Sequence, residues 1–277
     1  MRLVCFAFTM LAVFSTARAS GQSEEFTITI NLDATDGSAR VRRFSPSIID
    51  YEPLSAGDNT LDVDPGFYLI FTAAGLGTVG RFHVEADGSI TIVLDPTSSM
   101  SVMDELGNPL VDEFGSPLLQ LSGKPITINL DATDLSADFF RLGSLRAGNT
   151  LFRLLGGTNY RIATPKGQGV VGQFDIDENG SIILAPDSTS SMSVVDAIGN
   201  PLLDECGNSV LQLTGTDMSI NLDATNLSAT FRYLSNLQAG NTVFRLLRGT
   251  KYEIGTPKSQ GSVGKFDVEE DGSISIV

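Results

Sequence analysis

Acidic side chains around one Asn-Gly pair have the spacing of calcium ligands. Asp175, Asp177 and Asn179 alternate along the chain, and Gly180 follows them. This order matches the first ligands and the turn glycine of a calcium loop, in which carboxylate and amide oxygens surround the ion. The last ligand of such a loop is a bidentate glutamate, and this chain has Pro186 in its place. We therefore keep Asp175, Asp177 and Asn179 as candidate calcium ligands and expect no other cofactor.

The alternative is that these acids form the solvent side of a strand end. Alternate residues of a strand share one face, so the acids would lie opposite Phe174 and Ile176. Acidic residues also alternate before Asp87-Gly88 and before Asp271-Gly272. This recurrence favours a common turn, and calcium binding is the second interpretation.

Two glycine-rich segments, Gly75–Gly80 and Gly167–Gly172, have the G-x-G-x-x-G spacing of a dinucleotide site. In such a site a helix follows the glycines, because its N-terminus holds the pyrophosphate. Here an alternating pattern typical of a strand follows both segments, and a third copy begins with Ser259 in place of the first glycine. Glycine turns between strands explain all three copies.

Residue combinations typical of enzymes do not occur in the sequence. His83 is the only histidine, and there is no G-x-S-x-G, no H-E-x-x-H and no Cys/His metal spacing. We predict that the protein is not an enzyme. Aromatic side chains could instead form a platform for sugars. Trp is absent, so the candidates are Tyr51, Tyr68, Tyr160, Tyr233 and Tyr252.

All these residues belong to a repeating pattern. The segment Ile-Asn-Leu-Asp-Ala-Thr occurs at residues 30–35, 128–133 and 220–225. Each copy opens a block that leads to an Asn-Gly or Asp-Gly pair, and the first block has an insertion that we place within residues 50–58. Self-similarity at a nearly fixed period indicates copies of one structural unit.

Each block has the alternation of a β-sheet. Ile126, Ile128 and Leu130 share one face while polar residues share the other, and helical spacing is not sustained anywhere. An Asn-Gly or Asp-Gly pair between alternating runs indicates a hairpin. We predict an all-β protein with three tandem small β-sandwich-like repeats joined by β-hairpin connectors. The expected boundaries are a leader at 1–19, repeats at 20–95, 125–186 and 217–277, and connectors at 96–124 and 187–216. The alternative merges each connector with a neighbouring block into one unit of about ninety residues.

Two segments resemble known modules of secreted bacterial proteins. The second connector, SVVDAIGNPLLDECGNSVLQL from Ser193, resembles the opening strands of Ig-like and carboxypeptidase-regulatory-like domains. DPGFYLIF, from Asp64, is similar to their P-G-x-Y strand, although the D-x-x-G-x-F hairpin of regulatory-like domains is missing between the two segments. The resemblance implies a non-catalytic spacer or adhesion module.

The first nineteen residues have the pattern of a secretory signal peptide. Arg2 precedes an apolar run, Leu3–Phe14, and Ala17-Arg18-Ala19 is a small-residue cleavage site. An uncleaved anchor is the alternative, but the run is shorter than the roughly 20 residues that span a bilayer. We therefore predict cleavage after Ala19, no membrane insertion after cleavage, and a secreted or cell-surface location.

The mature chain is strongly acidic. Loss of Arg2 and Arg18 leaves 16 of the 18 basic residues against 33 acidic ones, a formal net charge of −17. Such a surface repels phosphate backbones and anionic lipids, so nucleic acid and membrane surfaces are not expected partners.

Cysteine content and strand edges lead to two further expectations. Cys5 leaves with the leader, and Cys206 takes the position that Phe114 holds in the other connector, so we expect Cys206 to be apolar and buried. The alternative is a lone thiol that pairs between chains or is reactive. The alternating segments Phe26–Leu32 and Ser273–Val277 could be open edges that pair head to tail between molecules. The alternative is a monomer whose edges are protected by nearby acids.

Together these patterns predict an exported, non-catalytic structural or adhesive repeat protein. The alternatives are a carbohydrate- or calcium-binding module and an accessory domain of a secreted hydrolase. The sequence identifies no particular protein or glycan ligand.

Overall fold

The computed structural model describes residues 25–35, 37–45, 47–72, 77–93, 99–225, 227, 229–257 and 261–277. The predicted leader, 1–19, and the predicted new N-terminus, Ser20, lie outside these residues. Nearly every element is a β-strand, and the exception is the short 3-10 turn η1 (Pro165–Gly167). Within these ranges no helix has the length and hydropathy needed to cross a membrane. The prediction of an all-β fold made of several repeated sheets is confirmed.

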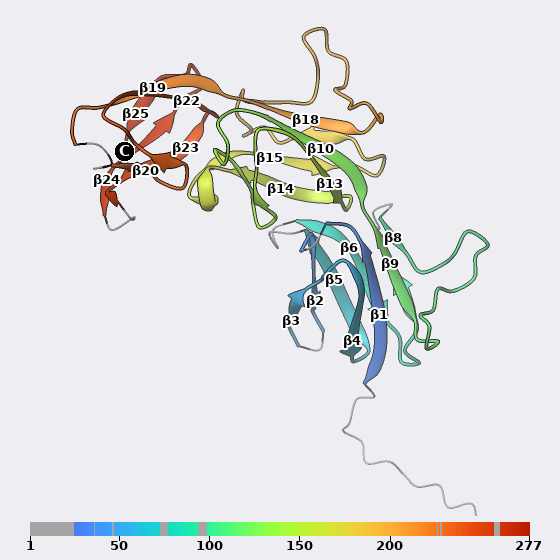
Figure 1. Ribbon diagram of the computed structural model, residues 1–277. Coiled ribbons are helices and arrows are strands. Elements are labelled where there is room, and N and C mark those ends of the chain that lie inside the picture. The colour runs from blue at the N-terminus through green and yellow to red at the C-terminus, as the bar shows by residue number, and fades with distance from the viewer. Residues whose placement is uncertain are drawn as a thin grey trace, which may run out of the picture.

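Repeat 1 consists of β1 to β9 and has two sheets (Figure 1). The four-stranded sheet has the order β4 (Gly57–Val63), β1 (Phe26–Asp33), β9 (Leu118–Ser122), β8 (Met100–Ser101). The five-stranded sheet has the order β3 (Ile49–Pro53), β2 (Ala39–Arg43), β5 (Gly66–Thr72), β6 (Thr78–Val84), β7 (Ile90–Ile92).

Repeat 2 consists of β10 to β18 and repeats this plan. Its four-stranded sheet has the order β13 (Gly148–Leu154), β10 (Lys124–Asp131), β18 (Ser209–Thr214), β17 (Met192–Ser193). Its five-stranded sheet has the order β12 (Gly143–Ser144), β11 (Asp138–Phe139), β14 (Gly157–Ala163), β15 (Val170–Ile176), β16 (Ile182–Leu184).

Repeat 3 consists of β19 to β25 and is smaller. Its five-stranded sheet has the order β21 (Ser235–Asn236), β20 (Thr230–Phe231), β23 (Gly249–Gly255), β24 (Ser262–Val268), β25 (Ile274–Ile276). Facing it is a pair made of β19 (Thr216–Leu222) and β22 (Gly240–Leu246). Two strands of the larger plan therefore have no counterpart in the described part of repeat 3.

Those two strands come from the connectors. β9 runs parallel to β1, and β18 runs parallel to β10, so each connector places its last strand in the sheet of the repeat before it. The connectors are thus more than joining arms. The sheet pairing agrees with the alternative in which each connector merges with one neighbouring block, and that block is the preceding one.

The same pairing changes the expectation for self-association. β1 lies between β4 and β9, and β9 pairs with Thr29–Asp33, so this part of the segment Phe26–Leu32 cannot accept a strand from another molecule. β25, which contains most of Ser273–Val277, is an edge strand paired only with β24 in the described residues. A strand from far along the chain already occupies most of the β1 edge, and the head-to-tail pairing stays a prediction.

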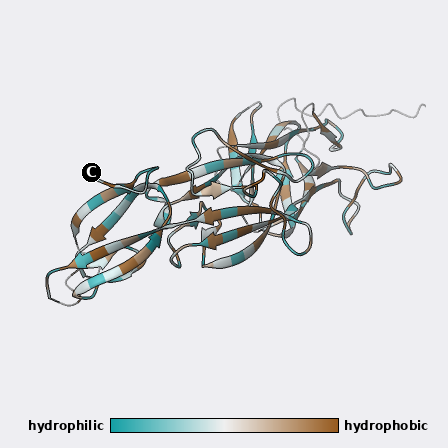
Figure 2. Ribbon diagram, turned by 90° about the horizontal axis from the view of Figure 1, so that it is seen from above, coloured by the Kyte–Doolittle hydropathy of each residue, from teal (hydrophilic) through white to brown (hydrophobic). Residues whose placement is uncertain are grey.

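Each repeat has its own apolar core, which the alternation along the strands produces (Figure 2). In repeat 2, Ile126, Ile128 and Leu130 point inward and are at most 2% exposed. Stacked Tyr–Phe pairs lie at the centre of the three cores, Tyr68–Phe82, Tyr160–Phe174 and Tyr252–Phe266. Rings of this size each bury about 150–250 Å² and dominate the energy of a small core.

Candidate functional site

The two candidate calcium-binding carboxylates, Asp175 and Asp177, each accept hydrogen bonds from the backbone. An Asp175 carboxylate oxygen accepts a 2.8 Å hydrogen bond from the backbone N–H of Asn159. An Asp177 oxygen accepts hydrogen bonds from the backbone of Asn179 (2.9 Å) and Ser181 (2.7 Å). Both carboxylates therefore stabilise backbone turns. Across the described ranges, no group of three or more His, Cys, Asp and Glu side chains is placed to hold a metal.

The other predicted motifs also have structural roles. After Gly167 the chain forms β15 and not a helix, whereas Gly75 lies outside the described residues. The His83 ring contacts Glu85, with 2.9 Å between Nδ1 and a carboxylate oxygen. The tyrosines do not make a sugar platform, because three of the five are core residues: Tyr68, Tyr160 and Tyr252.

Cys206 is exposed, which contradicts the expectation of burial. Phe114, which occupies the equivalent position in the other connector, is itself 84% exposed. Both residues lie at hairpin tips, where the preceding aspartates, Asp204 and Asp112, accept their backbone N–H groups at 2.9 Å. A tip that points to solvent accepts either side chain, so their exchange carried no information on burial.

Contacts between consecutive repeats form two joints in the described residues, one between repeats 1 and 2 and one between repeats 2 and 3. Leu155 follows β13 of repeat 2, yet its side chain is fully buried in the core of repeat 1. Leu247 follows β22 of repeat 3 and is buried in the core of repeat 2. Full burial of a leucine is worth about 1.5–3 kcal/mol. One leucine therefore anchors repeat 2 to repeat 1, and another anchors repeat 3 to repeat 2.

A reciprocal threonine–arginine contact accompanies each leucine. The backbone N–H of Thr35 donates to the Arg153 oxygen (2.8 Å), and the Arg153 N–H donates to the Thr35 hydroxyl (3.0 Å). Thr133 and Arg245 make the same two hydrogen bonds, both of 2.8 Å, at the second joint. The two joints are thus copies of one another.

The arginine side chains of the joints contribute less than their backbones. The Arg153 guanidinium lies 2.7 Å from Asp33 Oδ2, and Arg245 lies 3.0 Å from Asp131 Oδ2. All four side chains are about half exposed, and exposed ion pairs are typically worth about 0–1 kcal/mol. The buried leucine contributes most of the stabilising free energy of the joint, and the ion pair helps to orient the two repeats.

Glycines let the backbones approach at the joints. Gly123 lies alone between β9 and β10, and a Cβ there would come within 2.8 Å of the Arg153 carbonyl carbon. Gly215 lies alone between β18 and β19, where a Cβ would come within 2.9 Å of the Arg245 side chain. A side chain at either position would push the next repeat away from the joint.

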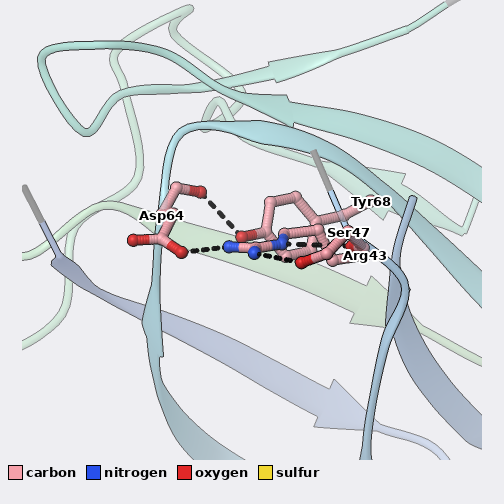
Figure 3. A network of polar contacts seen from close by, with 4 residues as sticks. All are labelled: Arg43, Ser47, Asp64 and Tyr68. Atoms are coloured by element: carbon pink, nitrogen blue, oxygen red, sulfur yellow. Dashed lines mark hydrogen bonds and ion pairs between the residues drawn. The ribbon is translucent and has the colours of Figure 1, made fainter. Parts of the chain in front are cut away.

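Repeat 1 differs at the position of the anchoring leucine. Asp64 follows β4 there, and its carboxylate binds the guanidinium of Arg43 (Figure 3). Arg43 also donates to the Ser47 hydroxyl at 2.9 Å, and the Tyr68 hydroxyl donates to the Asp64 backbone oxygen at 2.7 Å. The Asp64 hydrogen bond raises the pKa of Arg43. The charged pair closes this end of repeat 1, which carries no leucine for a preceding unit.

The connectors are attached to their repeats by aspartates. The Thr29 hydroxyl of β1 donates to Asp112 at 2.7 Å, and the Thr127 hydroxyl of β10 donates to Asp204 at 2.8 Å. Hydrogen bonds from Asn208, with a contribution from Thr127, lower the pKa of Asp204 to about 2. The ionised carboxylate therefore holds the hairpin against the sheet across the physiological pH range.

Sequence reasoning did not find Leu155, Leu247 or Asp64, although one signal was present. The position after the fourth strand of each repeat holds Asp64 in the first copy and leucine in the next two. A change from charged to apolar at a repeated position indicates that the first copy has a different neighbour there.

The chain was compared with protein families, curated proteins and solved structures, and nothing matches it. The resemblance to Ig-like and carboxypeptidase-regulatory-like domains therefore stays a prediction.

Proposed function

We propose that the protein is an exported, non-catalytic structural repeat protein that works as a spacer or adhesive module outside the cell or at its surface. The observation that supports this most is the duplicated joint. Leu155 and Leu247 fix successive repeats with the same contacts, and such fixed stacking suits a protein whose task is to hold a defined shape.

The hairpin tips are the surfaces that suit an adhesive role. Leu106, Phe114 and Ile198 are apolar and strongly exposed, although each lies in a rigid turn closed by an aspartate. Exposed apolar residues held by a rigid scaffold are typical of protein-interaction sites. We propose that contacts with other surface components are made by these tips.

Solution scattering of the mature chain tests the spacer function. The expected result is a profile that fits three repeats in one fixed arrangement, unchanged by moderate salt. The double variant Leu155→Asp, Leu247→Asp should broaden the profile to that of flexibly linked units. A wild-type chain that already scatters as independent units would reject the spacer function.

Adhesion needs a separate measurement. Binding of labelled mature protein to the producing cells is compared between wild type and a triple variant, Leu106→Ser, Phe114→Ser and Ile198→Ser. The variant should fold normally and bind less. Equal binding by both proteins would show that the tips are not the contact surface.

A further inference from the structure

The first strand of repeat 3 has an open edge that the other repeats fill. β10 is paired with β13 on one side and with β18 on the other, whereas β19 is paired only with β22 in the described residues. In repeats 1 and 2, backbone groups on this side of the first strand form hydrogen bonds with the connector or the residue after it. Thr29 N–H donates to Pro117 at 3.0 Å, and Asp131 C=O accepts from Gly215 at 2.9 Å. In repeat 3 the equivalent groups belong to Ser219 of β19 and to Asp223, the residue after it.

Apolar side chains next to this edge are exposed only in repeat 3. Val171 is fully buried in repeat 2, and the equivalent Val263 is 64% exposed. Ile182 is 8% exposed, and the equivalent Ile274 is 50% exposed. Residues whose counterparts belong to a core are therefore uncovered along one flank of the sandwich.

A glycine marks where a large side chain is missing. In repeat 2 the Met192 side chain of β17 packs against Gly172, so closely that a Cβ on the glycine would collide with its sulfur. Met100 and Gly80 have the same relationship in repeat 1. At the equivalent Gly264, no atom of the described chain lies within 4 Å of the place that a Cβ would occupy.

The polar attachment point is also present and exposed. Thr29 and Thr127 bind the connector aspartates through their hydroxyl groups. Repeat 3 has Ser219 at this position, so the hydroxyl is kept, and the residue is exposed. The edge thus offers an unpaired strand backbone, an apolar flank, open space over Gly264 and a hydroxyl donor, which are the features that a connector contacts in repeats 1 and 2.

From these four features we infer that the β19 edge of repeat 3 binds a connector-type strand from outside the described residues, which adds to the sheet parallel to β19. Its chemistry follows from β17 and β18. A methionine or similar side chain covers Gly264, two alternate leucines cover the exposed flank, and an aspartate accepts the Ser219 hydroxyl. Addition of an extended segment to a sheet edge is a common mode of peptide recognition.

A second copy of the described chain does not supply this strand. The described residues contain three first strands and two connector strands, so exchange between copies always leaves one first strand unfilled. Repeat 1 of a second copy cannot dock on repeat 3 through a leucine either, because it carries Asp64 at that position, bound to Arg43. The occupant is therefore a strand that the described residues do not contain.

The probe for the test is a synthetic peptide with the sequence of residues 191–214 and Cys206→Ser, added to the mature chain. Calorimetry should show saturable binding of one peptide per chain, and the melting temperature should rise with peptide concentration, as expected for a ligand of the folded state. A peptide with Leu211→Asp and Leu213→Asp should bind at least about tenfold more weakly, because its inward face is charged.

Two protein variants locate the site in repeat 3. Ser219→Pro removes a backbone donor from the open edge only. Gly264→Val fills the open space over Gly264, where the methionine side chain of the peptide would lie. Both should keep the wild-type circular dichroism spectrum and weaken peptide binding by about tenfold or more. Absence of binding, or binding that neither variant weakens, would overturn the proposal. A monomer–dimer equilibrium of the peptide-free chain that both variants abolish would also overturn it, since the occupant would then be a second copy.

Discussion

The Tyr160 hydroxyl donates a 2.9 Å hydrogen bond to the backbone oxygen of Leu155, and both residues are fully or almost fully buried. The tyrosine belongs to the core of repeat 2, whereas the leucine side chain lies in the core of repeat 1. This one bond therefore ties a core to the anchor that the repeat inserts into its neighbour. Tyr252 and Leu247 repeat it at 2.9 Å in the second joint.

The leucine should dominate the energy of the joint. Leu155→Ala is expected to lower the free energy of unfolding by about 2–5 kcal/mol, because it leaves a cavity in the core of repeat 1. Arg153→Ala, two residues away, removes only an exposed ion pair and should cost less than about 1 kcal/mol. Urea denaturation of both variants measures the difference. Equal effects would show that the side chain of Leu155 is not the anchor.

A pair of equivalent glycines should respond differently to the same substitution. Gly172→Ala is expected to cost about 1–3 kcal/mol, because the new methyl group meets Met192 and comes within 2.9 Å of Ser188 Cα. Gly264→Ala has open space around it and should change stability by less than about 0.5 kcal/mol. Thermal melts of the two variants check this. A large loss for Gly264→Ala would mean that a side chain already covers that glycine.

Attachment of the second connector should weaken in acid. The folded-state pKa of Asp204, about 2, is below the ordinary value of 3.8, so its ionised form stabilises the fold above pH 3.8. That contribution is lost as the pH falls from about 4 to about 2. Asp204→Asn should therefore lower the urea midpoint at pH 6 and make little difference near pH 2. Asp196→Asn, in the hairpin turn without a threonine partner, is the control with a smaller effect at pH 6.

Cys206 should react as an exposed thiol. With residues 1–19 removed it is the only cysteine, and an aromatic disulfide reagent should label the folded chain about as fast as the urea-unfolded chain. Labelling that requires unfolding would contradict the exposed position at the hairpin tip.

Local patterns in the sequence were sufficient for the strands but not for their partners. Alternation predicted β10 through Ile126, Ile128 and Leu130, and the Asn179-Gly180 pair predicted the hairpin between β15 and β16. Both signals depend on neighbouring residues. The parallel pairing of β9 with β1 joins segments separated by most of a repeat, and nothing within either segment specifies the other.

Burial could be predicted from the period-two alternation along a strand, but not from the exchange of one residue type for another at equivalent positions. Arg43 lies on the inward face of β2 with Ala39 and Val41, so its burial follows from the alternation along this strand. The prediction that Cys206 is buried is wrong, because its exchange with Phe114 does not indicate burial. The joints could not be predicted, because the sequence shows that Leu155 is apolar but does not show in which core its side chain packs.

The parallel pairing of β1 with β9 also determines how tension would pass through the chain. Force applied along the polypeptide enters repeat 1 at the start of β1 and leaves at the end of β9, where Gly123 leads into β10. Pulling two parallel strands from opposite ends loads their hydrogen bonds in shear, so the bonds must break together and not one after another. We expect repeats 1 and 2 to resist stretching in single-molecule pulling at clearly higher force than repeat 3, whose β19 lacks such a clamp in the described residues. A protein of this construction would yield first at its third repeat and keep the other two intact under load.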